Sequence, residues 1–198
     1  NINTANQDVG RSRAFAESMR TLEIIFSPEL QSSVSDEMTT FFNSFQDLSG
    51  FPEDFTVRST VVESAKNLCA SFRRVDSDLK SARESLNERV LQSTETVTQN
   101  LSEIDIPRII SSNNDMASAL VSSFNEIHRQ GYGTKQFAEQ IGRNFFKEPA
   151  SPDRVAAEID IDDIIYESVD AISAASSPQA PGDNVIANQL VMLKDRRI

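Results

Sequence analysis

Histidine is the side chain that most often moves protons near neutral pH, and this chain contains a single one, His128. One histidine cannot supply a catalytic dyad or a histidine-rich metal site, although a lone general base remains open. His128 lies beside an apolar stripe at the end of a predicted helix, where a cationic imidazole would also suit the helix dipole. We therefore expect a structural or surface histidine, not a catalytic one.

The chain also contains a single cysteine, Cys69, which excludes an internal disulfide framework and a multi-cysteine zinc site. Cys69 follows Leu68 on the apolar face of a predicted long helix, where a small packed side chain is the default role. A reactive thiol would need an electropositive pocket, and Arg73, one turn later, is too little evidence for one.

An acidic segment follows later, in a stretch between Arg154 and Lys194 that has no basic residue. The aspartate triplet within it suggests calcium, but Ile164 occupies the next alternate ligand position and no glycine follows. We expect a solvated acidic face, which could also steer subunit docking or discourage unwanted strand pairing. Its carboxylates are Glu158, Asp160, Asp162, Asp163, Glu167 and Asp170.

No other pattern in the sequence indicates chemistry. The glycines at Gly131-Tyr132-Gly133 and Pro181-Gly182 indicate turns, because neither pair has the spacing of a phosphate-binding loop. The sequence also lacks G-x-S-x-G, H-E-x-x-H and paired C-x-x-C motifs. We therefore predict no catalytic, cofactor-binding or metal-ligating residue, no cofactor, and no enzyme activity.

The net charge of the chain limits the kinds of partner that it can bind. The 198 residues carry a net charge of −11, with a pI near 4.6, which argues against nucleic acid and against an anionic membrane surface. Apolar runs are only a few residues long, so no membrane span is predicted. The start, Asn1 to Asn6, is polar and has neither a signal-peptide pattern nor an initiator methionine, so we expect a fragment of a longer protein.

Apolar residues at spacings of three and four predict the elements that must position these side chains. A first helix ends at Pro28 and a second ends before Gly50 and Pro52. The third, without glycine or proline between Glu53 and Pro107, would be roughly 70 Å long and needs partner helices along most of its length. The apolar positions are Phe15, Met19, Leu22 and Phe26 in the first helix; Val34, Met38, Phe41, Phe45 and Leu48 in the second; and Val57, Val61, Ala65, Leu68, Phe72, Val75, Leu79, Ala82, Leu86, Val90, Val97, Leu101 and Ile104 in the third.

The second half is less regular. We expect Pro107 to break the long helix and residues 111–115 to form a loop that caps a helix from Met116, ending before Gly131. Alternation between residues 155 and 161 predicts a half-buried strand, which residues 164–169 would continue or pair with. A final helix is capped by Asp183 or Asn184. Its apolar positions are Ile186, Leu190 and Leu193, and those of the preceding helix are Met116, Leu120, Phe124 and Ile127.

Three blocks, in this order, resemble the family of flagellar hook-associated protein 1, the hook–filament junction protein of FlgK type. The first contains paired phenylalanines, a helix-breaking turn, Arg58 and the run V-x-x-A-x-x-L-x-x-x-F that ends at Phe72. The second, FNEIHRQGYG, resembles an N-x-x-H-x-x-G turn, and the third is APGDNVIANQLVMLKD, after the pair Phe145 and Phe146. Matching positions in the second and third blocks are Asn125, His128, Gly131, Gly133, Gly182, Asp183, Asn184, Ala187 and Leu190.

This resemblance, which covers roughly residues 15–195, implies a structural subunit without a substrate. It would be exported without a cleaved signal, lie in the extracellular flagellum, and join hook to filament by helical polymerisation. Its partners would be the hook protein, the second hook-associated protein and an export chaperone. The polymerising terminal segments would be missing here, so the isolated fragment is expected to be a monomer. The block around His128 would be a turn and not a site.

Together these observations predict a mainly α fold: an elongated antiparallel helical bundle around one very long helix, with a small β element near residues 155–168. One helical core domain, residues 1–198, would be assembled from residues 1–104 and 113–198. An outer-domain insertion point near residues 105–112 would be short or missing. The alternatives are another flagellar axial protein, such as flagellin or the second hook-associated protein, and a cytoplasmic helical adaptor or coiled-coil protein.

Overall fold

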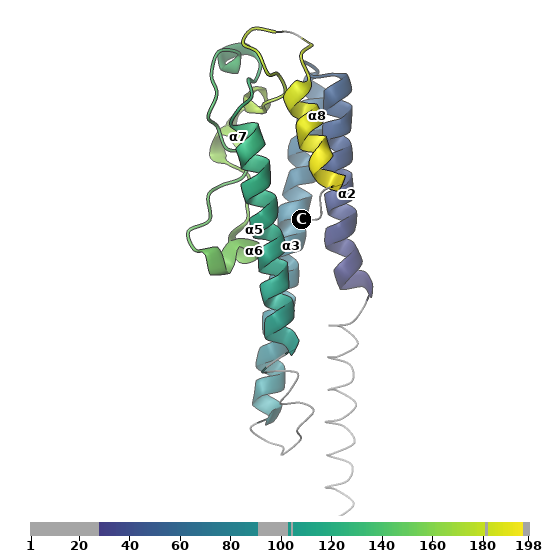
Figure 1. Ribbon diagram of the computed structural model, residues 1–198. Helices are drawn as coiled ribbons and strands as arrows, with labels where there is room; N and C mark the ends of the chain where they lie inside the picture. The colour runs from purple at the N-terminus through teal and green to yellow at the C-terminus, as the bar shows by residue number, and fades with distance from the viewer. Residues whose placement is uncertain (1–27, 91–102, 104, 181, 196–198) are drawn as a thin grey trace, which may run out of the picture.

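The computed structural model describes residues 28–90, 103, 105–180 and 182–195, and these form a bundle of roughly parallel and antiparallel helices (Figure 1). Three long helices make its length: α2 (Pro28–Gly50), α3 (Phe55–Val90) and α5 (Ile106–His128). The short α8 (Val185–Val191) packs beside α2 and α5 at one end. The predicted helical bundle is confirmed by this arrangement.

α2 and α3 form an antiparallel hairpin at the positions that the apolar spacing predicts. The phenylalanines of α2 and the aliphatic stripe of α3 face each other and are almost fully buried. Gly50 ends α2, and Asp54 starts α3, because its Oδ1 accepts hydrogen bonds from Thr56 N at 2.7 Å and Val57 N at 3.0 Å. The turn between them lies at the end of the bundle that we call the tip.

α3 contains 36 residues, which corresponds to about 54 Å at the rise of an α-helix. The extension predicted through Val97, Leu101 and Ile104 lies outside the described residues, as does the helix predicted over Phe15 to Phe26. Within its described length, α3 packs against α2 on one side and α5 on another.

The predicted break at Pro107 and loop at residues 111–115 are wrong, because α5 is already helical from Ile106. A proline in the first turn of a helix is tolerated, since the amide that it lacks would have had no intrahelical partner. The predicted cap residues instead act inside the helix. Asn114 donates to Pro152 O at 2.6 Å and accepts from Ala156 N at 3.1 Å, which ties α5 to the segment beside it.

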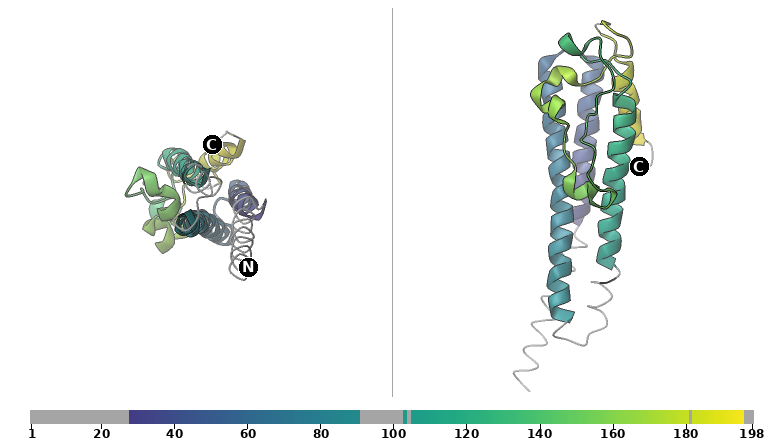
Figure 2. Two further views of the ribbon diagram at one scale, coloured as in Figure 1. Left: turned by 90° about the horizontal axis from the view of Figure 1, so that it is seen from below. Right: turned by 90° about the vertical axis from the view of Figure 1, so that its left-hand side faces the viewer.

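Residues 129–184, the return segment, leave the tip, run down the side of α3 and α5, and climb back to α8 (Figures 1 and 2). Several main-chain hydrogen bonds join the descending and ascending limbs, among them Lys147 N to Asp160 O and Asp162 N to Phe145 O, both at 2.9 Å. The short helices of the segment are η2 (Lys135–Phe137), η3 (Pro152–Arg154), α6 (Val155–Glu158), α7 (Asp163–Glu167) and η4 (Val169–Ala171).

The small β element predicted near residues 155–168 is wrong, since the described residues contain isolated bridges and no strand. Ile161 does pair with Phe146 in one antiparallel bridge, and Ile159 and Ile161 are buried on the same side. The residues before and after this pair are helical, because Val155 and Ala156 pack as one helical turn on α3 and α5 and Asp162 caps α7. Tertiary packing therefore overrides the two-residue alternation.

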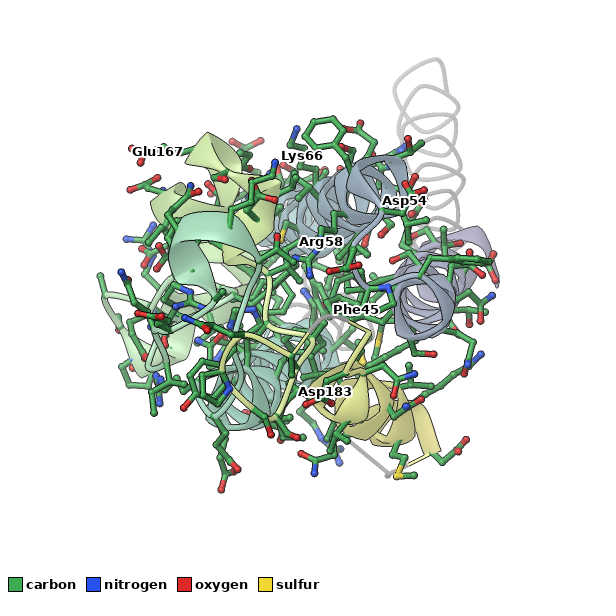
Figure 3. The ribbon with its side chains drawn as sticks, turned by 90° about the horizontal axis from the view of Figure 1, so that it is seen from above. Phe45, Asp54, Arg58, Lys66, Glu167 and Asp183 are labelled. Atoms are coloured by element: carbon green, nitrogen blue, oxygen red, sulfur yellow. The ribbon has the colours of Figure 1, made fainter. Side chains whose placement is uncertain are left out.

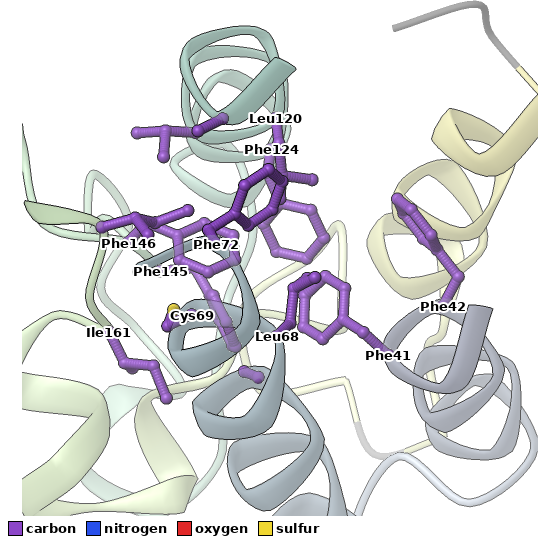
Figure 4. Packing of buried hydrophobic residues seen from close by; sticks show 14 of the residues in the cluster. Phe41, Phe42, Leu68, Cys69, Phe72, Leu120, Phe124, Phe145, Phe146 and Ile161 are labelled. Carbon is purple, nitrogen blue, oxygen red and sulfur yellow. The ribbon is translucent and has the colours of Figure 1, made fainter. Parts of the chain in front are cut away.

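A cluster of phenylalanines forms the centre of the core towards the tip (Figure 4). The ring of Phe124 on α5 lies 5.2 Å from that of Phe41 on α2, and 5.0 Å from that of Phe145 on the return segment. Edge-to-face and tilted pairs of this kind stabilise the core beyond the area that they bury, by about 0.5–1.5 kcal/mol each. The cluster thereby joins both halves of the chain. Its members are Phe41, Phe45, Phe124, Phe145 and Phe146, all fully buried.

Candidate functional site at the tip of the bundle

Polar side chains that are almost fully buried gather at the tip, where α2 ends, α3 begins, α5 ends and α8 begins (Figure 3). Burying a polar group is costly unless it is hydrogen-bonded, so such a cluster must serve a defined purpose. We call this cluster the polar lock. Its members are Arg58, Asn125, His128, Arg143 and Ser173.

Asn125, in the last turns of α5, holds the start of the descending limb. Its Oδ1 accepts hydrogen bonds from Phe145 N and Phe146 N, both at 3.0 Å, and its Nδ2 donates to Phe146 O at 2.8 Å. The asparagine amide therefore satisfies three main-chain groups that have left regular secondary structure. This places Phe145 and Phe146 in the aromatic cluster.

His128 is completely buried and neutral, so of the expected structural or surface roles it has the structural one, and it is not a cation at the helix end. Its Nε2 accepts from Ser173 N, and its Nδ1–H therefore donates to Arg143 O, both at 2.9 Å. Burial away from water lowers the pKa of His128 to about 3. The imidazole therefore links α5 to both limbs of the return segment as a structural group.

Gly131 and Gly133 allow the ascending limb to approach the end of α5. A Cβ at Gly131 would lie 2.7 Å from the Ser173 Cβ, and one at Gly133 would lie 2.2 Å from the main-chain oxygen of Asp170. Neither distance is sterically possible, so only glycine fits. The predicted turn after α5 is confirmed, and its glycines are required by close packing.

Arg58 fixes the ascending limb to the start of α3. It is 1% exposed, and it donates from Nε to Pro52 O at 2.7 Å and from Nη1 to Val169 O at 3.1 Å and Ile172 O at 2.9 Å. Loss of hydration lowers the pKa of Arg58 to about 10, against the attraction of Asp170 and Glu53. The guanidinium stays charged at neutral pH.

The third sequence block closes the tip from the other side. Asp183 accepts from Ser176 N at 2.8 Å, Ser177 N at 3.1 Å and Val185 N at 3.0 Å. The N-cap position of α8 is Asn184, whose side chain makes no capping hydrogen bond, so Asp183 bonds the first amide of the helix from the position before the cap. Burial alone would raise the pKa of Asp183, but these hydrogen bonds lower it. Asn184 instead donates to Ser49 O at 2.6 Å, which joins α8 to the end of α2.

The acidic segment is dispersed by the fold. Asp160 lies near Arg73 and Lys147, and Asp162 caps α7 by accepting from Ile164 N at 3.1 Å. Hydrogen bonds from Thr134 and Lys135 outweigh burial and lower the pKa of Asp170. No group of three or more histidine, cysteine, aspartate or glutamate side chains in the described part of the chain is arranged to hold a metal ion.

Cys69 is buried between α3 and the ascending limb, close to Ile161 (Figure 4). Burial raises the pKa of its thiol to about 12, in spite of the nearby Arg73. Cys69 is therefore a small, packed side chain in the core, as expected from the sequence.

The sequence reasoning assigned no role to Arg58, Arg143 or Ser173. Arg58 gave a usable signal, since it lies three residues before Val61 and therefore on the apolar stripe of α3, where a charged residue is unusual. Arg143 gave none, because it lies in an irregular segment. Its Nε donates to Ala171 O at 3.2 Å, whereas its Nη2 is buried without a partner among the described residues. The polar lock as a whole can hold segments together, but it presents no nucleophile with an adjacent base.

Comparison with known proteins identifies the helical core. Residues 19–106 match the family described as the flagellar hook-associated protein FlgK helical domain, which includes α2 and α3. Over these residues the chain is similar to the FlgK helical domain. This family is a structural component of the flagellum and not a family of enzymes. No curated protein and no solved structure matched the chain.

Proposed function

We propose that this chain, which carries the helical domain of a FlgK-type hook-associated protein, is the rigid core of the subunit that joins hook to filament. The observation that carries the proposal is the family match over residues 19–106, the segment that forms the α2–α3 hairpin. The subunit would assemble by helical polymerisation, with the hook protein and the second hook-associated protein as neighbours, and an export chaperone would bind it before secretion.

The geometry of the tip supports a load-bearing role. The segments beyond the family match, α5, the return segment and α8, are joined to the hairpin by the polar lock and the aromatic cluster. A bundle joined in this way resists bending and sliding of its helices, because each displacement would break buried hydrogen bonds. Such stiffness suits a subunit in the wall of a rod under torque.

We also propose that the domain is assembled from two segments on either side of an insertion point, with the second segment beginning at α5 and not at residue 113 as the sequence suggested. α3 and α5 are antiparallel neighbours, so α3 ends and α5 begins at the end of the bundle opposite the tip (Figure 1). An outer domain inserted there would not disturb the polar lock. Because α5 begins at Ile106, the insertion point would precede that residue.

Immunogold electron microscopy of isolated flagella tests the proposed position. An antibody raised against the 198-residue chain is expected to label a single band between hook and filament. Label along the whole filament would identify a flagellin, label confined to another position on the flagellum would identify another axial protein, and label absent from flagella would favour a cytoplasmic adaptor. The matching genetic prediction is that a deletion strain keeps its hooks, lacks attached filaments, and releases unassembled flagellin into the medium.

Export and oligomeric state have tests of their own. None of the helices in the described part of the chain combines the length and apolar character that a membrane span requires. We expect the full-length protein in the culture medium of a strain that cannot attach filaments. The isolated 198-residue chain is expected to elute as a monomer in size-exclusion chromatography with light scattering, and a concentration-dependent dimer would contradict this.

A further inference from the structure

A pocket of about 250 Å³ opens at the tip, between the start of α3, the turn after α5 and the segment that precedes α8. Most of its wall is small or apolar, with Pro52, Ala138, Ala174, Ala175 and Ala180 among the lining residues. This volume has room for one or two side chains of a partner, and it is too small for a large cofactor.

The guanidinium of Arg58 forms part of the pocket wall, and its hydrogen bonding is incomplete. Nε and Nη1 donate to main-chain oxygens, but no described residue accepts a hydrogen bond from Nη2. A charged side chain that is 1% exposed and keeps unused N–H groups beside a cavity can donate to an oxygen that enters it.

Strained backbone surrounds the same pocket. Lys135, with φ 48°, and Gln179, with φ 49°, are the non-glycine residues with positive φ among those that the structure describes, and both line the pocket. A left-handed conformation is unfavourable for a non-glycine residue, because its Cβ crowds the main chain. Such strain clusters at binding sites and switch regions of proteins.

The charges around the pocket decide the kind of ligand. Arg58 and Lys135 are balanced by Glu53 and Asp183, and Lys135 already pairs with Asp170 at 3.0 Å. The pocket therefore does not select an anion, because an anion would meet Glu53 and Asp183 as well as the cations. An uncharged oxygen acceptor, such as a carboxamide or a main-chain carbonyl, fits the Nη2 donor of Arg58 in a cavity that also contains the carboxylates of Glu53 and Asp183.

An exposed aromatic pair lies beside the entrance. Phe51 and Phe55, in the turn between α2 and α3, are 66% and 64% exposed and flank Pro52 and Glu53 of the pocket wall. The same turn carries Asp54 at the top of the bundle (Figure 3). Two exposed phenylalanines next to a pocket with an unused donor are typical of a protein-binding surface, where aromatic side chains serve as anchors.

We propose that this pocket binds a peptide segment of a neighbouring axial subunit, whose carboxamide or main-chain carbonyl accepts a hydrogen bond from Arg58 Nη2 while apolar side chains cover Phe51 and Phe55. The identity of the partner rests on the proposed function, whereas the chemistry of the pocket does not. The two parts are therefore tested separately.

The chemistry is tested by NMR titration of the ¹⁵N-labelled 198-residue chain with propionamide and, separately, with propionate. Propionamide is expected to shift the amide signals of Gly133 and Gly182 saturably at millimolar concentration, and propionate is expected to bind at least threefold more weakly. Ala138→Leu, which fills the pocket from a half-buried position, should weaken propionamide binding at least tenfold. Ala180→Leu provides a second filling variant if the first does not fold, and Ala157→Leu on α6, remote from the tip, is the matched control.

Equal or tighter binding of propionate would overturn the proposal, because it would make the pocket an anion site. Shifts that do not saturate, or that survive both filling variants, would also overturn it. Either result leaves the proposed function intact, since immunogold labelling of flagella does not depend on the pocket.

The partner is tested in cells by placing the photo-crosslinking residue p-benzoylphenylalanine at Phe51 of the full-length protein and irradiating intact flagella. The expected adduct contains a peptide of an axial subunit, identified by mass spectrometry, and its yield falls at least fivefold in the Ala138→Leu background but not in Ala157→Leu. An adduct with a protein outside the axial structure, or none in flagella that contain the protein, would overturn the assignment of the partner.

Discussion

Asn125 offers the sharpest test of how the tip is held together. It is 1% exposed, and its side chain satisfies two main-chain N–H groups and one main-chain carbonyl of Phe145 and Phe146. Asn125→Ala would leave these three groups buried and unpaired. Leaving one such group unsatisfied costs about 1–3 kcal/mol, so the three together should cost about 4 kcal/mol when partial relaxation is included. That is a large part of the 5–15 kcal/mol that typically stabilises a domain.

The free energy of unfolding is measured by urea titration of the 198-residue chain, followed by circular dichroism at 222 nm. Asn125→Leu separates the hydrogen bonds from the volume, because it fills the space and leaves the same groups unpaired, and a loss of about 3 kcal/mol or more is expected. Asn114→Ala is the control, since it also removes two side-chain bonds to the main chain, but at a half-buried position where water can replace them. A loss below about 1 kcal/mol for both Asn125 variants, at unchanged m-value, would refute the reasoning.

Four further outcomes are expected at the tip and in the core. Because the pKa of His128 is about 3 in the folded chain and near 6.5 when unfolded, only the unfolded state takes up this proton between those values, so stability falls as pH drops through that window. The loss between pH 7 and pH 5 should be about 2 kcal/mol, and the free energy of unfolding of His128→Gln should vary less with pH; parallel profiles would contradict this. Gly133→Ala should lower the free energy of unfolding by several kcal/mol, roughly 3 or more, because its Cβ meets a main-chain oxygen. Gly50→Ala, whose Cβ meets nothing within 4 Å, should change it by less than about 1 kcal/mol, and similar losses for the two would exclude the steric explanation. Cys69, buried and with a pKa raised to about 12, should react with Ellman's reagent at pH 8 only as fast as the chain unfolds, and rapid labelling of the native protein would show that the thiol is accessible.

The local sequence pattern was sufficient to predict the long helices. The spacing of three and four in α2 and α3 places their apolar residues on one face, and most of the positions that this spacing selects are buried. Phe42, Val62 and Cys69 are buried in addition, whereas Met38, Val57 and Ala82 are only partly buried. Gly50 and Gly131 correctly indicated where α2 and α5 end, because the end of a helix at a glycine depends on only a few neighbouring residues. The ordered blocks around Arg58, His128 and Asp183 likewise indicated the family, since they could be compared without knowledge of the fold.

The local sequence pattern gave wrong predictions where the conformation of a segment depends on its neighbours in space. A proline such as Pro107 breaks a helix when it lies in the interior, but it is tolerated in the first turn. The sequence alone does not say which position it occupies. Residues 155–161 alternate like a strand, but the described part of the chain offers no second strand to complete a sheet, and packing on α3 and α5 favours a helical turn followed by a single bridge.

The sequence by itself determined that the chain is a mainly helical bundle, where its α2–α3 hairpin lies, and which family it resembles. Only the tertiary structure decided what the polar residues of the tip do. Arg58 donates to Val169 O across 111 positions, and His128 accepts from Ser173 N across 45. Contacts at such separations follow from how the return segment crosses the helices, and no periodicity within one helix encodes them. The same crossing buries His128 and holds it neutral, because the protonated form could not be solvated there.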